Sequence, residues 1–154
     1  MNHLEPISLQ TYTLPSELVA QCRALHDWSA PLLLAVDRRE PPSARIDEDC
    51  LNALSAQEQE RQRSFRQTAD RERFVLGRGL LRLILGAWLS QAPRDVNIEF
   101  GPYGKPFCTG GPEFNLSHSG DLILLGLHPC RAVGVDVERM DADLDWQLIA
   151  QRLW

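Results

Sequence analysis

The sequence predicts an α+β fold, and three observations lead to this prediction. Helical patterning dominates from about residue 56 to residue 91. Short segments with strand-like alternation, separated by turn residues, follow from residue 97 onward. One apolar run, "PLLLAV" at 31–36, precedes the helical region and predicts a buried strand. With 154 residues the chain is long enough to bury one core, as one domain or as two small lobes.

Two helices are expected in the first part of the chain. The stretch "DRREPPSARIDED" at 37–49 is predicted to be a loop because of its prolines and charges. Ser55 lies three residues before Glu58, which is the spacing of a capping box, so a helix is expected from about residue 56. A second helix is predicted after a break near Thr68, and it must end by Pro93.

The second part of the chain is predicted to consist of short strands and a last helix. Gly and Pro residues mark a turn at "GPYGKP", and a second turn is expected at "PC", residues 129 and 130. The tail "DADLDWQLIAQRLW" has acidic residues in its first turn, which favour a helix start. The predicted strands lie at 97–100, 113–117, 121–128 and 131–138, the last two as neighbours.

The composition is that of a folded, water-soluble protein. Apolar residues make up 44% and charged residues 24% of the chain, which excludes a fibrous or disordered class. The apolar runs are too short to span a bilayer, and the N-terminus lacks the pattern of a signal peptide, so a cytoplasmic location is expected. The four cysteines form no C-x-x-C pair, which argues against a zinc site and a disulfide framework and predicts reduced, partly buried thiols.

Positive charge is concentrated in one segment of an acidic chain. The formal net charge is −5, yet residues 55–82 contain seven arginines and four acidic residues. This pattern favours a local anionic ligand over general nucleic-acid binding. Within the second helix, Arg71, Arg78 and Arg82 share one face by their spacing. That face is either a solvated surface, which is the commoner use of charge, or a stripe that binds phosphate.

Two carboxylates project from the same side of the expected strand "AVGVDVE". Val133, Val135 and Val137 alternate with Gly134, Asp136 and Glu138, so the valines face a core and the acids lie on the opposite face. The two acids are about 6.5 to 7 Å apart along the backbone. Mg²⁺ suits such a pair because it takes oxygen ligands and is usually held by one or two carboxylates. An ordinary amphipathic edge strand explains the same pattern.

The segment "NLSHSG" at 115–120 contains serines beside a histidine. Ser117 and His118 are sequence neighbours in a strand and point to opposite sides, so His118 is poorly placed as the base for Ser117. The G-x-S-x-G elbow of serine hydrolases is also absent. The remaining interpretations are a strand end whose hydroxyls satisfy turn amides, or a cradle of hydroxyls and imidazole for an anion. Lys105, in "GKP", is the only lysine and is suited to contact phosphate.

Taken in order, four motifs resemble the 4'-phosphopantetheinyl transferases of the surfactin-synthetase type. They are "ERFVLGRGLLR", "GKP", "FNLSHSG" and "GVDVE", and the resemblance covers roughly residues 60 to 140. It implies transfer of the 4'-phosphopantetheine arm of coenzyme A to a serine of an acyl, peptidyl or aryl carrier protein, with Mg²⁺ and release of 3',5'-ADP. The attacking serine then belongs to the carrier protein.

The resemblance also implies roles for individual residues. Asp136 and Glu138 are implied as catalytic Mg²⁺ ligands, and Ser117 and His118 as nucleotide and phosphate contacts. The remaining coenzyme A contacts implied by the resemblance are Lys105, Pro106, Arg61, Arg63, Arg71 and Arg78, the arginines forming a basic rim toward the 3'-phosphate.

The implied fold is the first lobe of a pseudo-twofold, two-lobe structure. Residues 1–132 are assigned to the N-terminal lobe and residues 133–154 to an incomplete C-terminal lobe. The sequence ends before a W-x-x-K-E-A-like motif. We therefore expect this chain to be a truncated monomer of weak or no activity, engaging coenzyme A and apo carrier protein but neither nucleic acid nor membrane. A non-catalytic relic that binds coenzyme A or a nucleotide is the alternative.

Overall fold

The structure is a computed structural model that describes residues 31–38 and 44–140, with the side chains of 44–47 excepted. Two sequence predictions, the tail helix at 141–154 and the partly buried, reduced thiol of Cys22, lie outside these ranges. Within them, no helix is both long enough and apolar enough to cross a membrane.

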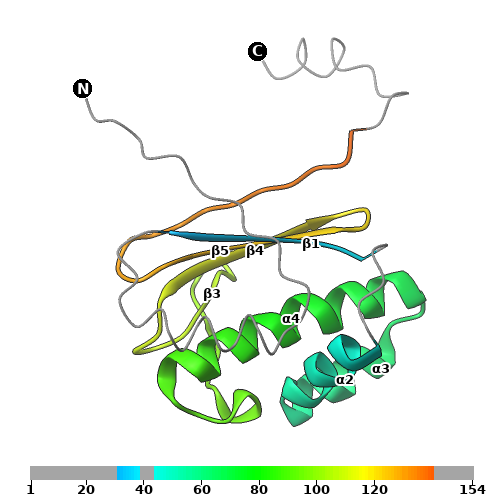
Figure 1. The fold of residues 1–154 in the computed structure, drawn as a ribbon, viewed down its shortest axis with the longest axis horizontal. Coiled ribbons are helices and arrows are strands. Elements are labelled where there is room, and N and C mark those ends of the chain that lie inside the picture. The colour runs from blue at the N-terminus through cyan, green and yellow to red at the C-terminus, as the bar shows by residue number, and fades with distance from the viewer. Residues whose placement is uncertain (1–30, 39–43, 141–154) are drawn as a thin grey trace.

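The described chain forms a helical layer packed on one face of an antiparallel sheet (Figure 1), which confirms the α+β prediction. The sheet has the strand order β1-β5-β4, so β4 is an outer strand. The strands are β1 (Leu32–Asp37), β2 (Glu99–Phe100), β3 (Pro106–Phe107), β4 (Glu113–Ser119) and β5 (Leu122–His128), with β2 and β3 forming a separate hairpin. The helices are α2 (Ala44–Ala53), α3 (Ala56–Ser64) and α4 (Thr68–Leu89), followed by a short 3₁₀ turn at Pro93–Asp95.

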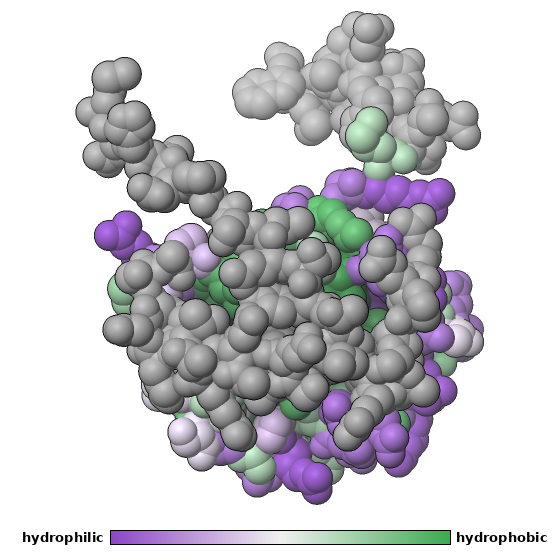
Figure 2. Space-filling model, viewed as in Figure 1, coloured by the Kyte–Doolittle hydropathy of each residue, from purple (hydrophilic) through white to green (hydrophobic). Residues whose placement is uncertain are grey.

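The core lies between α4 and the sheet. Leu81, Ile84 and Leu85 from the helix are fully buried, as are Phe114 and Leu127 from the strands. In β5 the buried hydrophobic residues occupy every second position, so these side chains face the helices. Hydrophilic residues gather along the lower right of Figure 2, where Figure 1 places α3 and the beginning of α4.

The helix boundaries follow the signals in the sequence. The predicted capping box forms, because Glu58 N donates to Ser55 Oγ at 3.3 Å and Ser55 N donates to Glu58 Oε2 at 3.0 Å. Helix α4 begins at Thr68, as expected, and ends before Pro93. Ser90 takes a left-handed conformation with φ of 55° and donates its N–H to Gly86 O, which closes the helix.

Two elements differ from the prediction. The stretch 37–49 is not a loop throughout, because α2 begins at Ala44 and buries Cys50 against α4. Residues 131–138 do not form a strand beside β5. They are assigned no strand and cross the face of the sheet opposite the helices as an extended segment, drawn in orange in Figure 1. We refer to residues 132–139 as the acidic segment.

The alternation predicted for the acidic segment is nevertheless present. Val133, Val135 and Val137 are half-buried, whereas Asp136 and Glu138 are exposed. Val133 and Val135 lie directly over Gly126 of β5, since a Cβ built on Gly126 would be 2.6 Å from Val135 Cγ1 and 3.2 Å from Val133 Cγ2. The valines therefore pack against the sheet, and the two acidic side chains are exposed.

Candidate functional site

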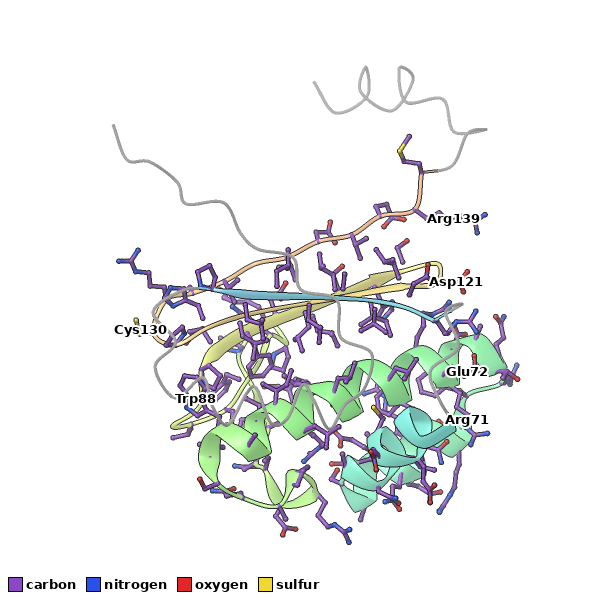
Figure 3. All side chains as sticks on the ribbon, viewed as in Figure 1. Arg71, Glu72, Trp88, Asp121, Cys130 and Arg139 are labelled. Atoms are coloured by element: carbon purple, nitrogen blue, oxygen red, sulfur yellow. The ribbon has the colours of Figure 1, made fainter. Side chains whose placement is uncertain are left out.

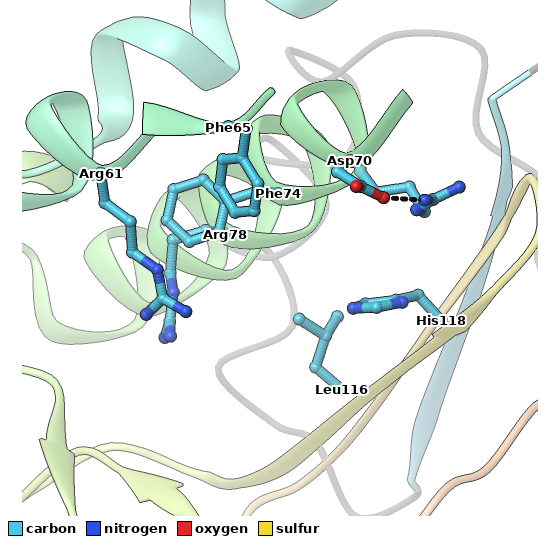
Figure 4. Close-up of a pocket in the computed structure, with 8 residues that line it drawn as sticks. Arg61, Phe65, Asp70, Phe74, Arg78, Leu116 and His118 are labelled. Atoms are coloured by element: carbon cyan, nitrogen blue, oxygen red, sulfur yellow. Dashed lines mark hydrogen bonds and ion pairs between the residues drawn. The ribbon is translucent and has the colours of Figure 1, made fainter. Parts of the chain in front are cut away.

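A basic pocket of about 300 Å³ opens between the helices and β4 (Figure 4). Helix α3 and the α3–α4 connection supply one wall, α4 supplies a second, and β4 supplies the floor. Three arginines and one aspartate line it together with a histidine, so its walls carry positive charge. The lining residues are Arg61, Phe65, Asp70, Arg73, Phe74, Arg78, Leu116 and His118.

Arg78 is the most buried charge in this basic pocket. Its Nε lies 3.2 Å from Glu58 Oε1, and its guanidinium lies over the Phe100 ring at 5.8 Å. Burial lowers the pKa of Arg78; Glu58 opposes this, and the nearby Arg82 and Arg61 lower it further. Its Nη1 is buried and has no hydrogen-bond partner among the described residues. An anion in the pocket would supply the missing acceptor.

Arg61 reaches the same space from α3. Its guanidinium lies over the Phe74 ring at 5.3 Å, and Phe74 in turn packs against Phe65 with the ring centroids 5.3 Å apart. Figure 4 shows the guanidinium groups of Arg61 and Arg78 side by side and His118 on the opposite wall. Two arginines from different helices thus converge on one point, which is the arrangement that a phosphate group requires.

Arg73 has a different function within the pocket. It forms an ion pair with Asp70, and its Nη1 donates to the carbonyl of Gly120 at 2.7 Å. It therefore fixes the β4–β5 turn to the N-terminal end of α4. Arg38 supports the same turn, because its side chain pairs with both Glu72 and Asp121.

The structure separates the other predicted arginines from the basic pocket. Arg71 Nε donates to Gln62 Oε1 at 2.6 Å, and Arg71 lines a different cavity of about 220 Å³ beside Glu72, at the α4 end marked in Figure 3. Arg63 lies exposed on α3 and pairs with Glu60 at 3.3 Å. The roles predicted for Arg63 and Arg71 in ligand binding stay predictions.

Arg82 belongs to neither interpretation of the arginine face. It is 4% exposed and pairs with Glu58, so it is neither solvated nor placed to bind phosphate. Its Nη1 also donates to three backbone carbonyls, those of Pro93 at 2.8 Å, Val96 at 3.0 Å and Arg94 at 3.3 Å. Arg78 and Arg82 share Glu58 as a partner, whereas Arg71 binds Gln62, so the three arginines do not form a single phosphate-binding stripe.

Ser117 and His118 lie on opposite faces of β4. His118 lines the basic pocket on the helical side. Ser117 points to the other side, where its Oγ donates to Asp136 Oδ1 at 2.8 Å. The geometry that argued against a Ser-His nucleophile is thus present, and the serine–histidine cluster contributes to two different places in the molecule.

The carboxylates of Asp136 and Glu138 are exposed on the outer side of the acidic segment. Ser119 Oγ donates to Glu138 Oε1 at 3.0 Å, as Ser117 does to Asp136. Each carboxylate thus has one hydrogen-bonded oxygen and a second oxygen without a hydrogen bond to any described residue. No cluster of three or more His, Cys, Asp or Glu side chains that could hold a metal occurs in the described ranges. Two carboxylates with outward oxygens still fit Mg²⁺, which is often completed by phosphate and water.

The β2–β3 hairpin contacts the beginning of the acidic segment. Lys105 Nζ donates to the carbonyl of Val133 at 3.2 Å and lies 4.0 Å from Glu113 Oε2. Pro106 begins β3 on the same hairpin. Lys105 therefore contacts the acidic segment, whereas Pro106 pairs with Phe100, whose ring lies against Arg78 of the basic pocket.

Sequence reasoning missed three groups in this region. Glu58 was assigned only to a helix cap, yet it also pairs with Arg78 and Arg82. Asn115 and Ser119 were not singled out as separate contacts, although both bind the acidic segment. Their signal was present, since polar residues occupy every second position of β4 opposite its buried face.

Comparison with known protein families shows to which family the chain belongs. A family model described as "4'-phosphopantetheinyl transferase, N-terminal" matches residues 41–129, which is more than half of the chain. The chain belongs to the 4'-phosphopantetheinyl transferase family.

Several curated proteins are similar to this chain over part of their length. The 4'-phosphopantetheinyl transferase HetI of Nostoc sp. is 32% identical over 91% of this chain and 58% of its own. A phosphopantetheinyl transferase of Thraustochytrium sp. is 40% identical over 57% of this chain and 32% of its own. The 4'-phosphopantetheinyl transferase of Bacillus subtilis is 30% identical over 65% of this chain and 45% of its own. The chain thus spans less than two thirds of these relatives.

Proposed function

We propose that this chain binds coenzyme A and takes part in transferring its 4'-phosphopantetheine arm to a serine hydroxyl of an acyl or peptidyl carrier protein. Support comes from the family match, from the relatives that are named for this activity, and from the basic pocket. The buried Arg78 Nη1, without a hydrogen-bond partner among the described residues, is the observation that carries the proposal. It indicates an anion acceptor in the pocket.

In this proposal the 3'-phosphate of coenzyme A occupies the basic pocket. Arg78 and Arg61 donate to its oxygens, and His118 contacts it from β4. The low local polarity at Arg78 strengthens such a bond, because a buried charge is poorly solvated in the free protein. Arg73 stays paired with Asp70 and holds the turn in place.

The rest of the coenzyme would pass around the edge of β4. This strand pairs with β5 on one side and is the outer strand of the described sheet. The basic pocket lies on its helical face and the acidic segment on its other face, so a ligand that reaches both must cross that edge. The pyrophosphate then approaches Asp136 and Glu138, with Lys105 and Pro106 as further contacts.

Asp136 and Glu138 would hold Mg²⁺ with their outward oxygens. When bound, the ion would neutralise charge on the pyrophosphate oxygens and on the departing group. The serine oxygen of the carrier protein would form a bond to the phosphorus of the arm, the hydroxyl proton would pass to solvent, and the pyrophosphate bond to 3',5'-ADP would break. Ser117 and Ser119 keep the two carboxylates turned outward for this purpose.

Other statements about the whole protein stay predictions from the sequence. They are the lobe boundary at residue 132, a monomeric state, a cytoplasmic location, the lack of nucleic-acid and membrane binding, and weak or absent activity in this chain. A direct assay addresses the last of these, since transfer to an apo carrier protein adds the mass of one phosphopantetheine arm.

Calorimetry with coenzyme A and with 3'-dephospho-coenzyme A tests the proposed pocket. We expect the chain to bind coenzyme A at least about 10-fold more tightly, because a charge-assisted hydrogen bond is worth about 1.5 to 3 kcal/mol. Arg78→Met should reduce that difference by most of its size, with Arg61 and His118 left as contacts. Arg94→Met is the control, since Arg94 is exposed and does not line the basic pocket, and it should leave the ratio unchanged.

Equal affinities of the unmodified chain for coenzyme A and 3'-dephospho-coenzyme A would show that the basic pocket is not the 3'-phosphate site. Coenzyme A binding without any Mg²⁺-dependent transfer to an apo carrier protein would favour the non-catalytic coenzyme A-binding relic.

A further inference from the structure

Three polar side chains of β4 hold the acidic segment against the sheet. They occupy alternate positions on the face opposite the helices, and each accepts a backbone N–H from the segment. In each case the donor lies twenty residues later in the chain. The pairs are Val135 N to Asn115 Oδ1 at 2.8 Å, Val137 N to Ser117 Oγ at 3.2 Å, and Arg139 N to Ser119 Oγ at 3.0 Å.

The two serines also bind the carboxylates. Ser117 donates its hydrogen to Asp136 Oδ1 at 2.8 Å, and Ser119 donates to Glu138 Oε1 at 3.0 Å. A hydroxyl group has one hydrogen, and that hydrogen is used in both cases. Each serine therefore joins one carboxylate and the next backbone amide in a single bridge.

These side-chain contacts take the place of the backbone hydrogen bonds that would join two neighbouring strands. The acidic segment lies over the sheet and not at its edge, so its amides cannot reach carbonyls of β4 and are met by side chains instead. Val133 and Val135 fill the space above Gly126 at the same time. Figure 3 shows the segment running between Cys130 and Arg139 along the sheet.

The alternation of residues in β4 and in the acidic segment fixes the register between them. Both partners have a period of two, so a slip by one residue would turn the carboxylates toward the sheet and the valines toward solvent. A slip by two residues would place Gly134 opposite Ser117 in one direction and Met140 opposite Ser119 in the other, so one hydroxyl would lose its carboxylate in either case. Only the observed register satisfies both serines and buries the valines.

We propose that Asn115, Ser117 and Ser119 are positioning residues that set the register of the acidic segment and decide which carboxylate oxygens of Asp136 and Glu138 face outward. The inference rests on the proposed function for the role of those oxygens as metal ligands. It changes the expected role of Ser117, because the hydrogen that would contact a phosphate of coenzyme A is given to Asp136.

Ser119→Ala and Ser117→Ala test this role in the full chain, with three measurements for each variant. The first is Mn²⁺ binding by electron paramagnetic resonance, with the metal alone as the probe. The second is hydrogen exchange of the Val137 and Arg139 amides. The third is coenzyme A affinity in the absence of divalent metal.

We expect each variant to lose about 10-fold or more in Mn²⁺ affinity, since groups that orient metal-binding carboxylates typically contribute that much. Hydrogen exchange of the Arg139 amide should accelerate in Ser119→Ala. Hydrogen exchange of the Val137 amide should accelerate in Ser117→Ala. Metal-free coenzyme A affinity should not change. Ser119→Thr keeps the hydroxyl and should restore Mn²⁺ binding.

Thr109→Val is the matched control. Thr109 Oγ1 also donates to a carboxylate, Glu99 Oε1 at 3.2 Å, but on the β2–β3 side of the molecule. Removing this hydroxyl should leave Mn²⁺ affinity and the exchange of both amides unchanged.

Three outcomes would overturn the inference. One is unchanged amide exchange and Mn²⁺ affinity in both serine variants. Another is a loss of metal-free coenzyme A affinity in Ser117→Ala with unchanged Mn²⁺ affinity, which would make Ser117 a direct contact. The last is an absence of Mn²⁺ binding by the unmodified chain. Failure of coenzyme A binding with intact Mn²⁺ binding would count only against the proposed function.

Discussion

Gly79 of α4 lies against the backbone of Cys50 in α2, so close that a Cβ on Gly79 would be 2.5 Å from Cys50 Cβ and 2.6 Å from its carbonyl oxygen. The two helices can approach to this distance only because position 79 has no side chain. Cys50 is fully buried at the contact. Gly79 therefore sets the distance between α4, which lines the basic pocket, and α2, which packs behind it.

Gly79→Ala should destabilise the protein although alanine favours helices. The helix gains about 1 kcal/mol from the substitution, but overpacking against a backbone costs about 1 to 3 kcal/mol or more. We expect a net loss in the free energy of unfolding, measured in urea. Gly77→Ala is the control in the same helix, because its Cβ would meet side chains and no backbone, with Leu116 Cδ2 nearest at 3.3 Å and Ile123 Cγ2 at 3.6 Å. Equal stability of the two variants would contradict this account.

Arg82 should be far more important for stability than for ligand binding. Arg82→Met leaves three backbone carbonyls without their donor and removes one of the two arginines paired with Glu58. Breaking such a buried pair costs about 3 to 5 kcal/mol. Arg63→Met, which breaks the exposed pair with Glu60, should cost less than about 1 kcal/mol. Urea denaturation of both variants compares them, and similar losses would show that Arg82 is not a structural ion.

Local signals in the sequence were sufficient for the elements that depend on local contacts. The Ser55 and Glu58 capping box marked the start of α3, and Pro93 limited the extent of α4. The alternation of Val133, Val135 and Val137 with acidic residues predicted which side chains face the sheet. Such patterns succeed because capping and period-two burial involve residues that are near one another in the chain.

Features that depend on distant contacts could not be predicted in the same way. The stretch 37–49 contains prolines that favour a loop, but α2 forms because Cys50 packs against Gly79, a contact across 29 positions of the sequence. The helical spacing of the arginines gave no information on Glu58, which pairs with both Arg78 and Arg82, or on Gln62, which accepts a hydrogen bond from Arg71. The acidic segment lacks strand pairing because side chains of β4 take its amides.

The thiols of Cys108 and Cys130 should differ in reactivity. Burial raises the pKa of Cys108, Glu99 raises it further and Arg82 opposes the change, whereas Cys130 is exposed. Iodoacetamide at neutral pH should modify Cys130 at least about 10-fold faster, since the thiolate is the reactive form. Peptide mapping in a Cys22→Ser background measures both rates.

The raised pKa of Cys108 also predicts a pH dependence of stability. The unfolded thiol loses its proton at lower pH than the folded one, so the contribution of Cys108 is complete below the unfolded pKa. It declines as the pH rises through the unfolded value toward the folded one. Cys108→Ala should therefore weaken the alkaline loss of stability, as measured by urea denaturation over that range. An unchanged alkaline slope would contradict this assignment.

Gly126→Ala should displace the acidic segment while leaving the helical layer in place. Gly126 is buried in the central strand, opposite Leu33 on one side and Asn115 on the other. An added Cβ would lie 2.6 Å from Val135 Cγ1, and a valine in that position has no flexible end that can yield. The segment must then move away from β4, which lengthens the hydrogen bonds to Asn115, Ser117 and Ser119.

We expect Gly126→Ala to lose about 1 to 3 kcal/mol of stability and to increase hydrogen exchange at the Val135, Val137 and Arg139 amides together. Mn²⁺ affinity should fall with them, because both carboxylates move with the backbone. Gly134→Ala is the matched control: it lies in the same segment, and nothing surrounds its Cβ position within 4 Å. If Gly134→Ala and Gly126→Ala change exchange equally, the close approach at Gly126 does not hold the segment, and its position must depend on the side chains of β4 alone.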